Sequence, residues 1–246
     1  MLYSGFKKYK RDKSYWQELK NKYEGNRGFV IGNGPSLKIG DLTKLQNEGE
    51  ITIASNKIFL AFDQTPWRPS IFTIADGLVW DKIAHQIHED IEVVHTRYDL
   101  DYKKSNVPVR VWRRLKDTYR KLNEVKFSDN LIQGMHPGGT VTFENLQIAI
   151  YLGLNPIYII GCDHYYGGED DEKGTTISHK KGIENHFIKG YRKPGEKAGK
   201  ANLGFMNASY LSVKAYADLK GIKVFNATRG GYLEVFERTI FDDLFH

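Results

Sequence analysis

The sequence has one cysteine, Cys162, among its 246 residues, and it has no long apolar run. A single cysteine cannot form a disulfide within the chain or supply a cysteine-based zinc site. No apolar stretch approaches the roughly 18 residues of a membrane-crossing helix. The first 13 residues also lack the apolar core of a signal peptide. We therefore expect a cytoplasmic protein.

Repeats and low-complexity tracts are absent as well, and the composition is that of a folded protein. Hydrophobic residues make up 40% of the chain and charged residues 27%, which is enough apolar surface for a packed core and excludes wholesale disorder. The length suits one large domain.

The positive charge is concentrated in two segments. The formal net charge is +6; residues 1–27 hold eight Lys and Arg against three acids, and residues 103–126 hold nine against two. Aromatic residues lie between the lysines of the first segment, which suits a helix resting on anionic lipid or a helix packed on the domain with its lysines in water. No recognised nucleic-acid reading motif accompanies the charge, so we expect no nucleic-acid partner.

Short apolar runs that alternate with helical stretches predict a doubly wound, mostly parallel α/β sheet of the Rossmann-like type. A weaker sixth candidate strand lies at residues 91–95. The five clear strands are predicted at residues 28–32, 51–55, 71–75, 157–161 and 222–226.

Helices are predicted between these strands. One helix is predicted over residues 143–152, with Gly153 directly after its end. A second is predicted where apolar residues from 206 to 217 recur at helical spacing before Gly221. Residues 109–125 have helical propensity and a strongly basic face. We expect residues 1–27 to be a basic accessory segment and residues 28–246 to be a single catalytic domain.

Residues 166–204 differ from the rest of the chain, because they hold eight glycines, many charges and little apolar periodicity. A connection of this length predicts a mobile lid. Its acidic residues 169–172 could hold a divalent cation or form a solvated edge. His179 and His186 lie in the same segment and could act as general bases or remain bystanders in solvent.

Small, polar or ionisable residues follow each of the five predicted strands. Ligands of open α/β sheets bind beyond the carboxyl ends of the strands, so this pattern indicates a ligand site. Asn56 and Asp76 could bind a ribose or a base, or cap a helix. The residues at these strand ends are Gly32, Asn33, Gly34, Ser36, Asn56, Asp76, Asp163, His164, Tyr165 and Thr228.

The first of these strand ends, Gly32-Asn33-Gly34-Pro35-Ser36, is the most informative. Its glycines allow a phosphate to approach the backbone, and Ser36 is placed to cap the helix that follows. Leu37 stands where a dinucleotide-binding fingerprint has its third glycine, and no Gly-Lys-Ser/Thr of a Walker A loop follows.

Several motifs together resemble one superfamily. They are GFVIGNGPSL at 28–37, SNKIF at 55–59, GGTVTFENLQIAIYLGLNPIYIIGCDHYY at 138–166 and NATRGG at 226–231. They are similar to the bacterial CMP-sialic-acid-dependent sialyltransferases. They are also similar to the broader group of motility-associated-factor glycosyltransferases and MptE-like 6-hydroxymethylpterin diphosphokinases.

The resemblance implies a nucleotide site built from these strand ends. In the sialyltransferases the turn contacts the phosphate and ribose, which implies Gly32, Asn33, Gly34 and Ser36 here, and Asn56 also contacts the nucleotide. Tyr165 would hold the leaving phosphate beside Asp163. His186, with His179 as the second candidate, would be the general base on the acceptor hydroxyl.

We therefore expect a sialyltransferase-like glycosyltransferase. It would move a sugar from a nucleotide-activated donor, CMP-sugar favoured, to a hydroxyl of a glycan or glycolipid in cell-surface polysaccharide or lipopolysaccharide biosynthesis. No resident cofactor or metal is expected. The alternatives are an MptE-like diphosphokinase that uses ATP and Mg²⁺, with Asp76 and Asp163 as metal candidates, and a non-catalytic nucleotide-binding protein.

The basic N-terminal segment could also bind the inner face of the membrane, which would make the protein a peripheral membrane protein. Arg113 and Arg114 in the second basic segment are candidates for attracting a diphosphate or an anionic acceptor. The oligomeric state stays open, a homo-oligomer included.

Overall fold

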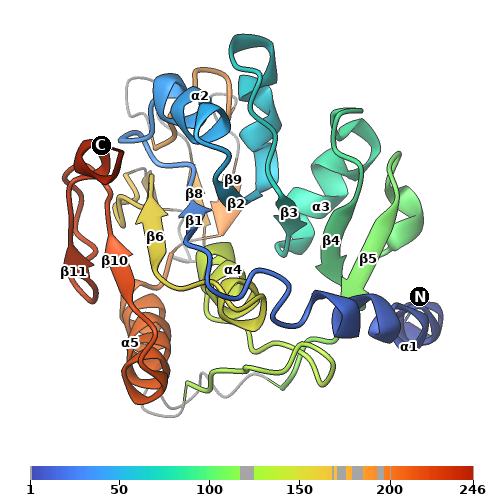
Figure 1. Cartoon of the computed structure of the whole chain (residues 1–246). Coiled ribbons are helices and arrows are strands. Elements are labelled where there is room, and N and C mark those ends of the chain that lie inside the picture. The colour runs from blue at the N-terminus through green and yellow to red at the C-terminus, as the bar shows by residue number, and fades with distance from the viewer. Residues whose placement is uncertain are drawn as a thin grey trace.

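A parallel sheet of eight strands forms the centre of the described structure (Figure 1). The computed structural model describes residues 2–116, 125–167, 169–170, 176–178, 185–192, 197–199 and 201–245. The strands of this sheet are β1 (Gly28–Ile31), β2 (Ile51–Ser55), β3 (Ile71–Ile74), β4 (Val94–Arg97), β5 (Val109–Trp112), β6 (Ile157–Ile160), β10 (Val224–Asn226) and β11 (Glu237–Arg238).

The strand order is β11-β10-β6-β1-β2-β3-β4-β5, and every neighbouring pair is parallel. From β1 the chain builds outward to β5, and it then returns to the other side of β1 as β6. The switch point of the sheet therefore lies between β1 and β6, where open α/β sheets bind their ligands. This arrangement confirms the predicted α/β, Rossmann-like sheet.

Helices cover both faces of the sheet. The longer ones are α1 (Leu2–Leu19), α2 (Ile39–Asn47), α3 (Gly77–Ile83), α4 (Val141–Tyr151) and α5 (Leu203–Lys220), and the 3-10 segments are η1 (Asn56–Gln64), η2 (Ala84–Gln86), η3 (Tyr102–Lys104) and η5 (Phe241–Leu244). The predicted helices over 143–152 and 206–217 are confirmed as α4 and α5.

Successive side chains of β1 point into two separate cores, because a strand alternates its faces. Val30 packs in the core that contains Leu146 of α4 and Tyr210 of α5. Phe29 and Ile31 pack in the other core, which contains α2, η1 and α3. Both faces of β1 are thus buried, which is why its sequence is a continuous apolar run.

The helix predicted over 109–125 is wrong at every residue of that stretch that the structure describes, 109–116 and 125. Val109–Trp112 form β5, which pairs with β4 from Val94 to Arg97. Val111 and Trp112 are buried in this edge strand, and the gain from pairing and burial outweighs the weak helical propensity of the segment. The candidate helper Arg113 follows directly after the strand, and residues 117–124 lie outside the described part of the chain.

Helix α1 covers the outer edge of β5. The outward N–H of Val111 donates to Oδ2 of Asp12 at 2.9 Å, and the indole Nε1 of Trp16 donates to the Val111 carbonyl oxygen at 2.8 Å. Asp12 and Trp16 are 2% and 0% exposed. The polar backbone groups of this edge residue are thus satisfied by side chains of α1 instead of by another strand.

A second polar link joins α1 to the sheet interior. The Tyr15 hydroxyl lies 2.7 Å from Nε2 of His95, and Nδ1 of His95 lies 3.0 Å from the Phe72 carbonyl oxygen. Burial lowers the pKa of His95 to about 4. The ring is therefore neutral near pH 7, with Nδ1 donating to Phe72 and Nε2 accepting from Tyr15.

Part of the predicted lid segment, residues 166–204, is described. It forms a small antiparallel sheet of β7 (Glu169–Asp170), β8 (Thr176–Ser178) and β9 (Lys197–Gly199). Its last two residues belong to α5, which begins at Leu203. His179 and the acidic residues 171–172 lie outside the described part, so the predictions made for them stay predictions.

None of the helices among the described residues combines the length and the apolar character that a membrane crossing requires.

Candidate active site

A pocket of about 510 Å³ opens at the carboxyl ends of β1, β2, β3, β4 and β6. This volume is in the usual range for small-molecule sites, and its position is the one that the strand order predicts. Eight of the residues predicted for the site line it, together with His164: Gly32, Asn33, Gly34, Asn56, Asp76, Asp163, Tyr165 and His186.

The turn after β1 lies directly against the turn after β6. The N–H of Gly34 donates to the Gly161 carbonyl oxygen at 2.8 Å. A Cβ atom on Gly34 would lie 1.9 Å from Oδ2 of Asp163, and one on Gly32 would lie 2.3 Å from the Gly161 carbonyl oxygen. Glycine is thus favoured at both positions, because a side chain on Gly32 would meet the Gly161 backbone and one on Gly34 would meet the Asp163 carboxylate.

Ser36 holds Asp163 in place and does not cap a helix. Its hydroxyl donates to Oδ2 of Asp163 at 2.8 Å, and its N–H donates to the same oxygen at 3.3 Å. Helix α2 begins three residues later, at Ile39, with Lys38 as the N-cap and Asp41 accepting from the Lys38 N–H. The predicted capping role of Ser36 is wrong, because Lys38 is the N-cap of α2 and the Ser36 hydroxyl donates to Asp163.

Asn33 and Asn56 each present a buried carbonyl oxygen that has no hydrogen-bond partner among the described residues. The Asn33 side-chain amide is fixed by donating to the Ser55 carbonyl oxygen at 3.1 Å. Asn56 has a φ of 60°, a left-handed conformation that asparagine tolerates better than most residues. An unsatisfied buried acceptor is unfavourable, so these two oxygens mark where a ligand would donate hydrogen bonds.

The segment 185–192 is bound to the same strand ends. The Phe187 N–H donates to the Asn33 carbonyl oxygen at 3.1 Å, and Nζ of Lys57 donates to the Tyr191 carbonyl oxygen at 2.7 Å. The ring of His186 stacks flat on the Tyr191 ring, with centroids 3.8 Å apart. His186 is therefore held at the pocket by a ring that is itself 7% exposed.

Asp76 lines the pocket and also caps α3. Its Oδ1 accepts from the N–H groups of Leu78 and Val79, at 2.7 and 3.4 Å. The capping alternative is thus realised, and the second carboxylate oxygen of Asp76 is not used by the cap.

Glu144, in the first turn of α4, is a pocket residue that the sequence reasoning missed. It is 6% exposed, and its Oε2 has no hydrogen-bond partner among the described residues. Burial raises the pKa of Glu144 to about 8, against the opposing charges of Arg97 and Arg114. The carboxyl group is therefore protonated near neutral pH and can donate a hydrogen bond to a ligand.

Residues 3–169 match the sequence profile of a family described as 6-hydroxymethylpterin diphosphokinase MptE-like. The match covers well over half of the chain. The protein belongs to the MptE-like family.

A structural likeness extends the comparison to the rest of this MptE-like chain. The structure of MAf glycosyltransferase from Magnetospirillum magneticum AMB-1 superposes with a TM-score of 0.52 at 14% sequence identity. The likeness covers 95% of this chain but 38% of the other, so this chain spans well under half the length of that protein. At this identity the likeness establishes a shared fold. Among curated proteins, none matches the sequence.

Two predicted residues of the MptE-like protein do not line the pocket. Thr228 is buried, and its hydroxyl accepts from the Cys162 N–H at 3.2 Å, so it supports the turn after β6 from behind. Ser36 acts through Asp163, as described above. Tyr165 does line the pocket, at its rim, with 54% of its surface exposed. Burial raises the pKa of the nearby Cys162 thiol to about 11, which makes that thiol unreactive.

His164 lines the pocket between Asp163 and Tyr165, in the turn after β6. It is 6% exposed and its φ is 55°. Its ring meets the Tyr210 ring edge-on at 5.8 Å, and burial lowers the pKa of the His164 imidazole. This histidine is therefore neutral near pH 7. Its ring both packs against Tyr210 and lines the pocket.

Positive side chains line the part of the pocket near β3, β4 and α3. They are Lys82, Arg97 and Arg114, and Arg97 also pairs with Asp99. Of the two arginines predicted to attract a diphosphate or an anionic acceptor, Arg114 lines the pocket and Arg113 does not. No cluster of three or more His, Cys, Asp or Glu suited to a metal ion occurs among the residues that the structure describes. The carboxyl groups that line the pocket are those of Asp76, Asp163 and Glu144.

Proposed function

We propose that this MptE-like protein is a nucleotide-dependent transferase that moves a sugar from a nucleotide-activated donor to an acceptor hydroxyl. The unpaired oxygens of Asn33 and Asn56 beside the close glycine turn carry this proposal. They are positioned to accept hydrogen bonds from ribose hydroxyls or a base amine.

The chemistry follows from the groups around that turn. His186 would take the proton of the acceptor hydroxyl while the oxygen bonds to the anomeric carbon. The bond from that carbon to the phosphate oxygen would break, and the nucleotide would leave with the electron pair. Lys57, Arg192 and Tyr165 line the same pocket and would stabilise the charge on the departing phosphate.

The comparisons support a transferase in coarse terms. Both names, MptE-like diphosphokinase and MAf glycosyltransferase, are those of enzymes that transfer a group. We favour a CMP-activated sugar as the donor because the GNGPS and SNKIF motifs are similar to those of CMP-dependent sialyltransferases. A glycan or glycolipid of the cell surface would be the acceptor.

Diphosphate transfer from ATP to a hydroxymethylpterin is the second candidate, and the family name favours it. That reaction also needs a deprotonated hydroxyl and a nucleotide site, so the same residues would serve it. It would in addition need Mg²⁺, for which Asp76 and Asp163 offer carboxylate oxygens. One oxygen of each is already used, by the α3 cap and by Ser36.

A thermal-shift screen against CMP, CDP, UDP, GDP and ATP tests the shared part of both candidates. A ligand that binds the folded state raises the melting temperature, and the rise grows with the ratio of ligand concentration to Kd. We expect stabilisation by CMP without added Mg²⁺. Stabilisation by ATP only when Mg²⁺ is present, with ATP consumed when a hydroxymethylpterin is added, would replace the sugar-transfer proposal. No stabilisation by any of these nucleotides would count against both transferase candidates.

The proposed role of His186 is tested by a pair of substitutions. His186→Phe keeps a flat ring on Tyr191 but cannot take a proton, whereas His186→Ala removes both. We expect both variants to lose turnover about 10²-fold or more while nucleotide binding stays nearly intact. His85→Ala, which changes an exposed histidine outside the pocket, is the control. Equal loss of binding and turnover would remove His186 from the base role.

A further inference from the structure

Helix α1 carries a row of basic side chains on the side that faces away from the sheet. Lys7, Lys10, Arg11 and Lys13 are exposed. The one acid among residues 2–17, Asp12, is buried and paired with Lys8 and Arg110, so it does not offset the charge of the outer surface.

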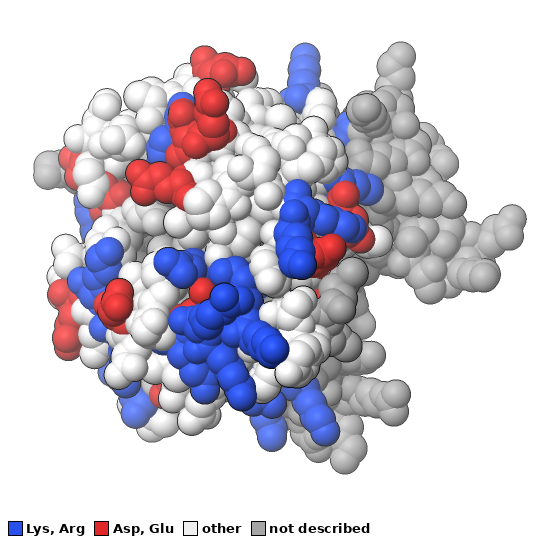
Figure 2. Space-filling view, turned by 90° about the vertical axis from the view of Figure 1, so that its right-hand side faces the viewer, with Lys and Arg blue, Asp and Glu red and all other residues white. Residues whose placement is uncertain are grey.

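Neighbouring elements extend this positive surface. Nζ of Lys8 lies 5.5 Å from the Tyr102 ring centroid, which places η3 and its exposed Lys103 beside α1. Figure 2 shows Lys and Arg side chains gathered on this side of the molecule. We call the surface the α1 basic face; it consists of Lys7, Lys10, Arg11, Lys13 and Lys103.

Two exposed aromatic rings lie among these lysines. Tyr3 is 72% and Phe6 37% exposed. Nζ of Lys7 lies 4.6 Å from the Tyr3 ring centroid, and Nζ of Lys10 lies 5.0 Å from that of Phe6. Cations interleaved with aromatic rings on one helix face are typical of a surface that rests at the lipid headgroup level.

The α1 basic face is part of the folded body, because the opposite side of the helix is anchored. Trp16 and Asp12 bind Val111, as described above, and the Tyr9 hydroxyl donates to the Ile132 carbonyl oxygen at 2.5 Å. The charges are therefore already arranged on a fixed helix, and binding would need no further folding.

The face also lies close to the pocket. Tyr98 packs against the rings of Phe6 and Tyr9, with centroids 6.4 Å apart in both cases. The preceding residue, Arg97, lines the pocket. A surface that binds the α1 basic face would therefore be next to the pocket entrance on the β4 side.

We propose that the α1 basic face docks the protein on a membrane that contains anionic lipid. The cations would bind the lipid phosphates, and Tyr3 and Phe6 would enter the headgroup region. Delivery of a lipid-linked acceptor to the pocket would follow and rests on the proposed function, whereas the docking itself does not. A polyanion without apolar groups would use the cations but leave the two exposed rings in water, whereas lipid uses both; single-stranded nucleic acid, whose bases can stack on such rings, is the competitor that the test includes.

Vesicle co-sedimentation tests the proposal with the full chain. The probes are vesicles of phosphatidylcholine alone and of phosphatidylcholine mixed with phosphatidylglycerol. We expect binding to the mixed vesicles, little binding to phosphatidylcholine, and release as the salt concentration rises. The triple variant K7E/K10E/K13E should bind about tenfold more weakly or worse, and Tyr3→Ser should bind more weakly without any change in net charge.

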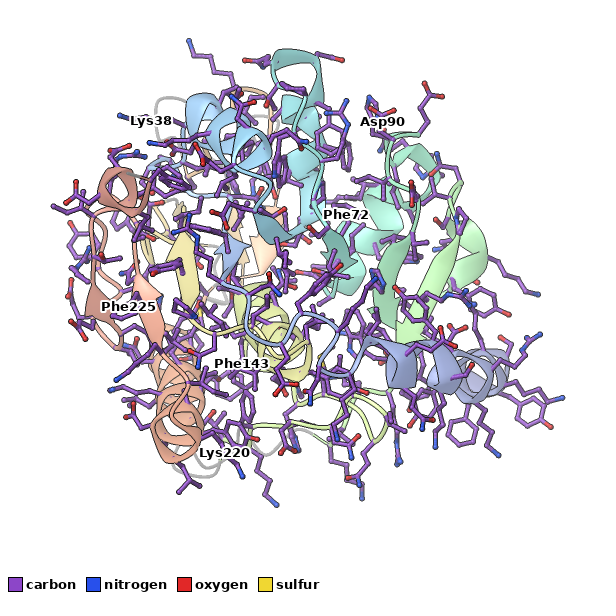
Figure 3. The ribbon with its side chains drawn as sticks, viewed as in Figure 1. Lys38, Phe72, Asp90, Phe143, Lys220 and Phe225 are labelled. Atoms are coloured by element: carbon purple, nitrogen blue, oxygen red, sulfur yellow. The ribbon has the colours of Figure 1, made fainter. Side chains whose placement is uncertain are left out.

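The matched control is K38E/K220E/K223E, which changes the net charge by the same amount. Lys38 and Lys220 lie at the other edge of the sheet (Figure 3), and Lys223 follows α5. We expect this control to bind like the unchanged protein, and circular dichroism melting should confirm that both triple variants fold; if K7E/K10E/K13E does not, Lys10→Glu alone replaces it.

Three results would overturn the proposal. They are equal binding to both kinds of vesicle, equal loss of binding in both triple variants, and displacement of the vesicles by single-stranded RNA at equal phosphate concentration. The last would assign the face to nucleic acid. Since lipid binding is measured without turnover, failure here is separable from failure of the nucleotide screen.

Discussion

Ser36 and Asp163 are 127 residues apart in the sequence and are joined by two hydrogen bonds to one carboxylate oxygen, from the Ser36 hydroxyl at 2.8 Å and from its N–H at 3.3 Å. They connect the turn after β1 to the turn after β6 across the switch point. The two turns that border the pocket are therefore joined by side-chain as well as backbone hydrogen bonds.

Ser36→Ala should loosen this connection. Removing a hydrogen bond to a charged group costs about 1.5–3 kcal/mol, so we expect a lower free energy of unfolding in urea and weaker nucleotide binding by calorimetry. Ser14→Ala, at an exposed position on α1, should change neither. Unchanged nucleotide affinity in Ser36→Ala would show that the turn does not depend on Asp163.

Gly34→Ala should abolish nucleotide binding. The added methyl group would lie 1.9 Å from Oδ2 of Asp163 and 2.9 Å from the Gly161 carbonyl oxygen, so the Asp163 side chain and the turn after β1 would both have to shift. Gly40→Ala is the matched control, because a Cβ on that glycine of α2 meets nothing within 4 Å. There we expect full binding and a gain in stability of about 0.5–1 kcal/mol. A thermal-shift titration of both variants with nucleotide measures the contrast, and normal binding by Gly34→Ala would contradict the close approach of the turns.

Glu144 should make stability depend on pH. The unfolded chain releases the Glu144 proton near the ordinary pKa of 4.5, whereas the folded protein holds it up to a pKa of about 8. Between these values the folded state binds more protons than the unfolded state, so the free energy of unfolding should fall as the pH rises through this window.

Glu144→Gln should remove that dependence. Urea unfolding at pH 5, 7 and 9 should give a difference between the variant and the unchanged protein that grows with pH to roughly 2–4 kcal/mol. Glu92→Gln, an exposed acid after η2, should leave the slope unchanged. If Glu144→Gln keeps the original slope, the carboxyl group is ionised in the folded protein.

Asp12→Ala should destabilise the fold more than its place in an N-terminal helix would indicate. It leaves the Val111 N–H, which is buried, without a partner, at a cost of about 1–3 kcal/mol. Glu18→Ala removes an exposed acid from the same helix and should have little effect. Chemical unfolding of both variants measures the difference. If Asp12→Ala loses no more free energy of unfolding than Glu18→Ala does, water replaces Asp12 as the partner of the Val111 N–H.

The strands were predictable where both faces are buried, because burial on two sides leaves a continuous apolar run. β1, β2, β3 and β6 follow this rule. β5 does not follow it, because Arg110 alternates with valines. The pairing and covering of β5 also depend on β4 and α1, which are separate elements of the chain. The alternation of Val109, Arg110 and Val111 was the available signal, and the helical propensity of the following residues outweighed it.

The candidate site was predictable to the extent that parallel strand ends meet at one edge. Asn33, Asn56, Asp76 and Asp163 come together for this reason. Glu144 was missed because it belongs to a helix, although an acid within the apolar run FENLQIAIYLG was a usable signal. Ser36 and Thr228 follow strands as well, but only the structure shows that their hydroxyls bind protein groups.

The covering of β5 by α1 has a consequence for the chain's behaviour in solution. Without Asp12 and Trp16, the outer N–H and carbonyl of Val111 would be open to pairing with a strand of another molecule. A chain shortened to begin after α1 should therefore self-associate through strand addition, which light scattering would detect as concentration-dependent growth. In this sense the N-terminal helix keeps the sheet from continuing into a neighbouring copy.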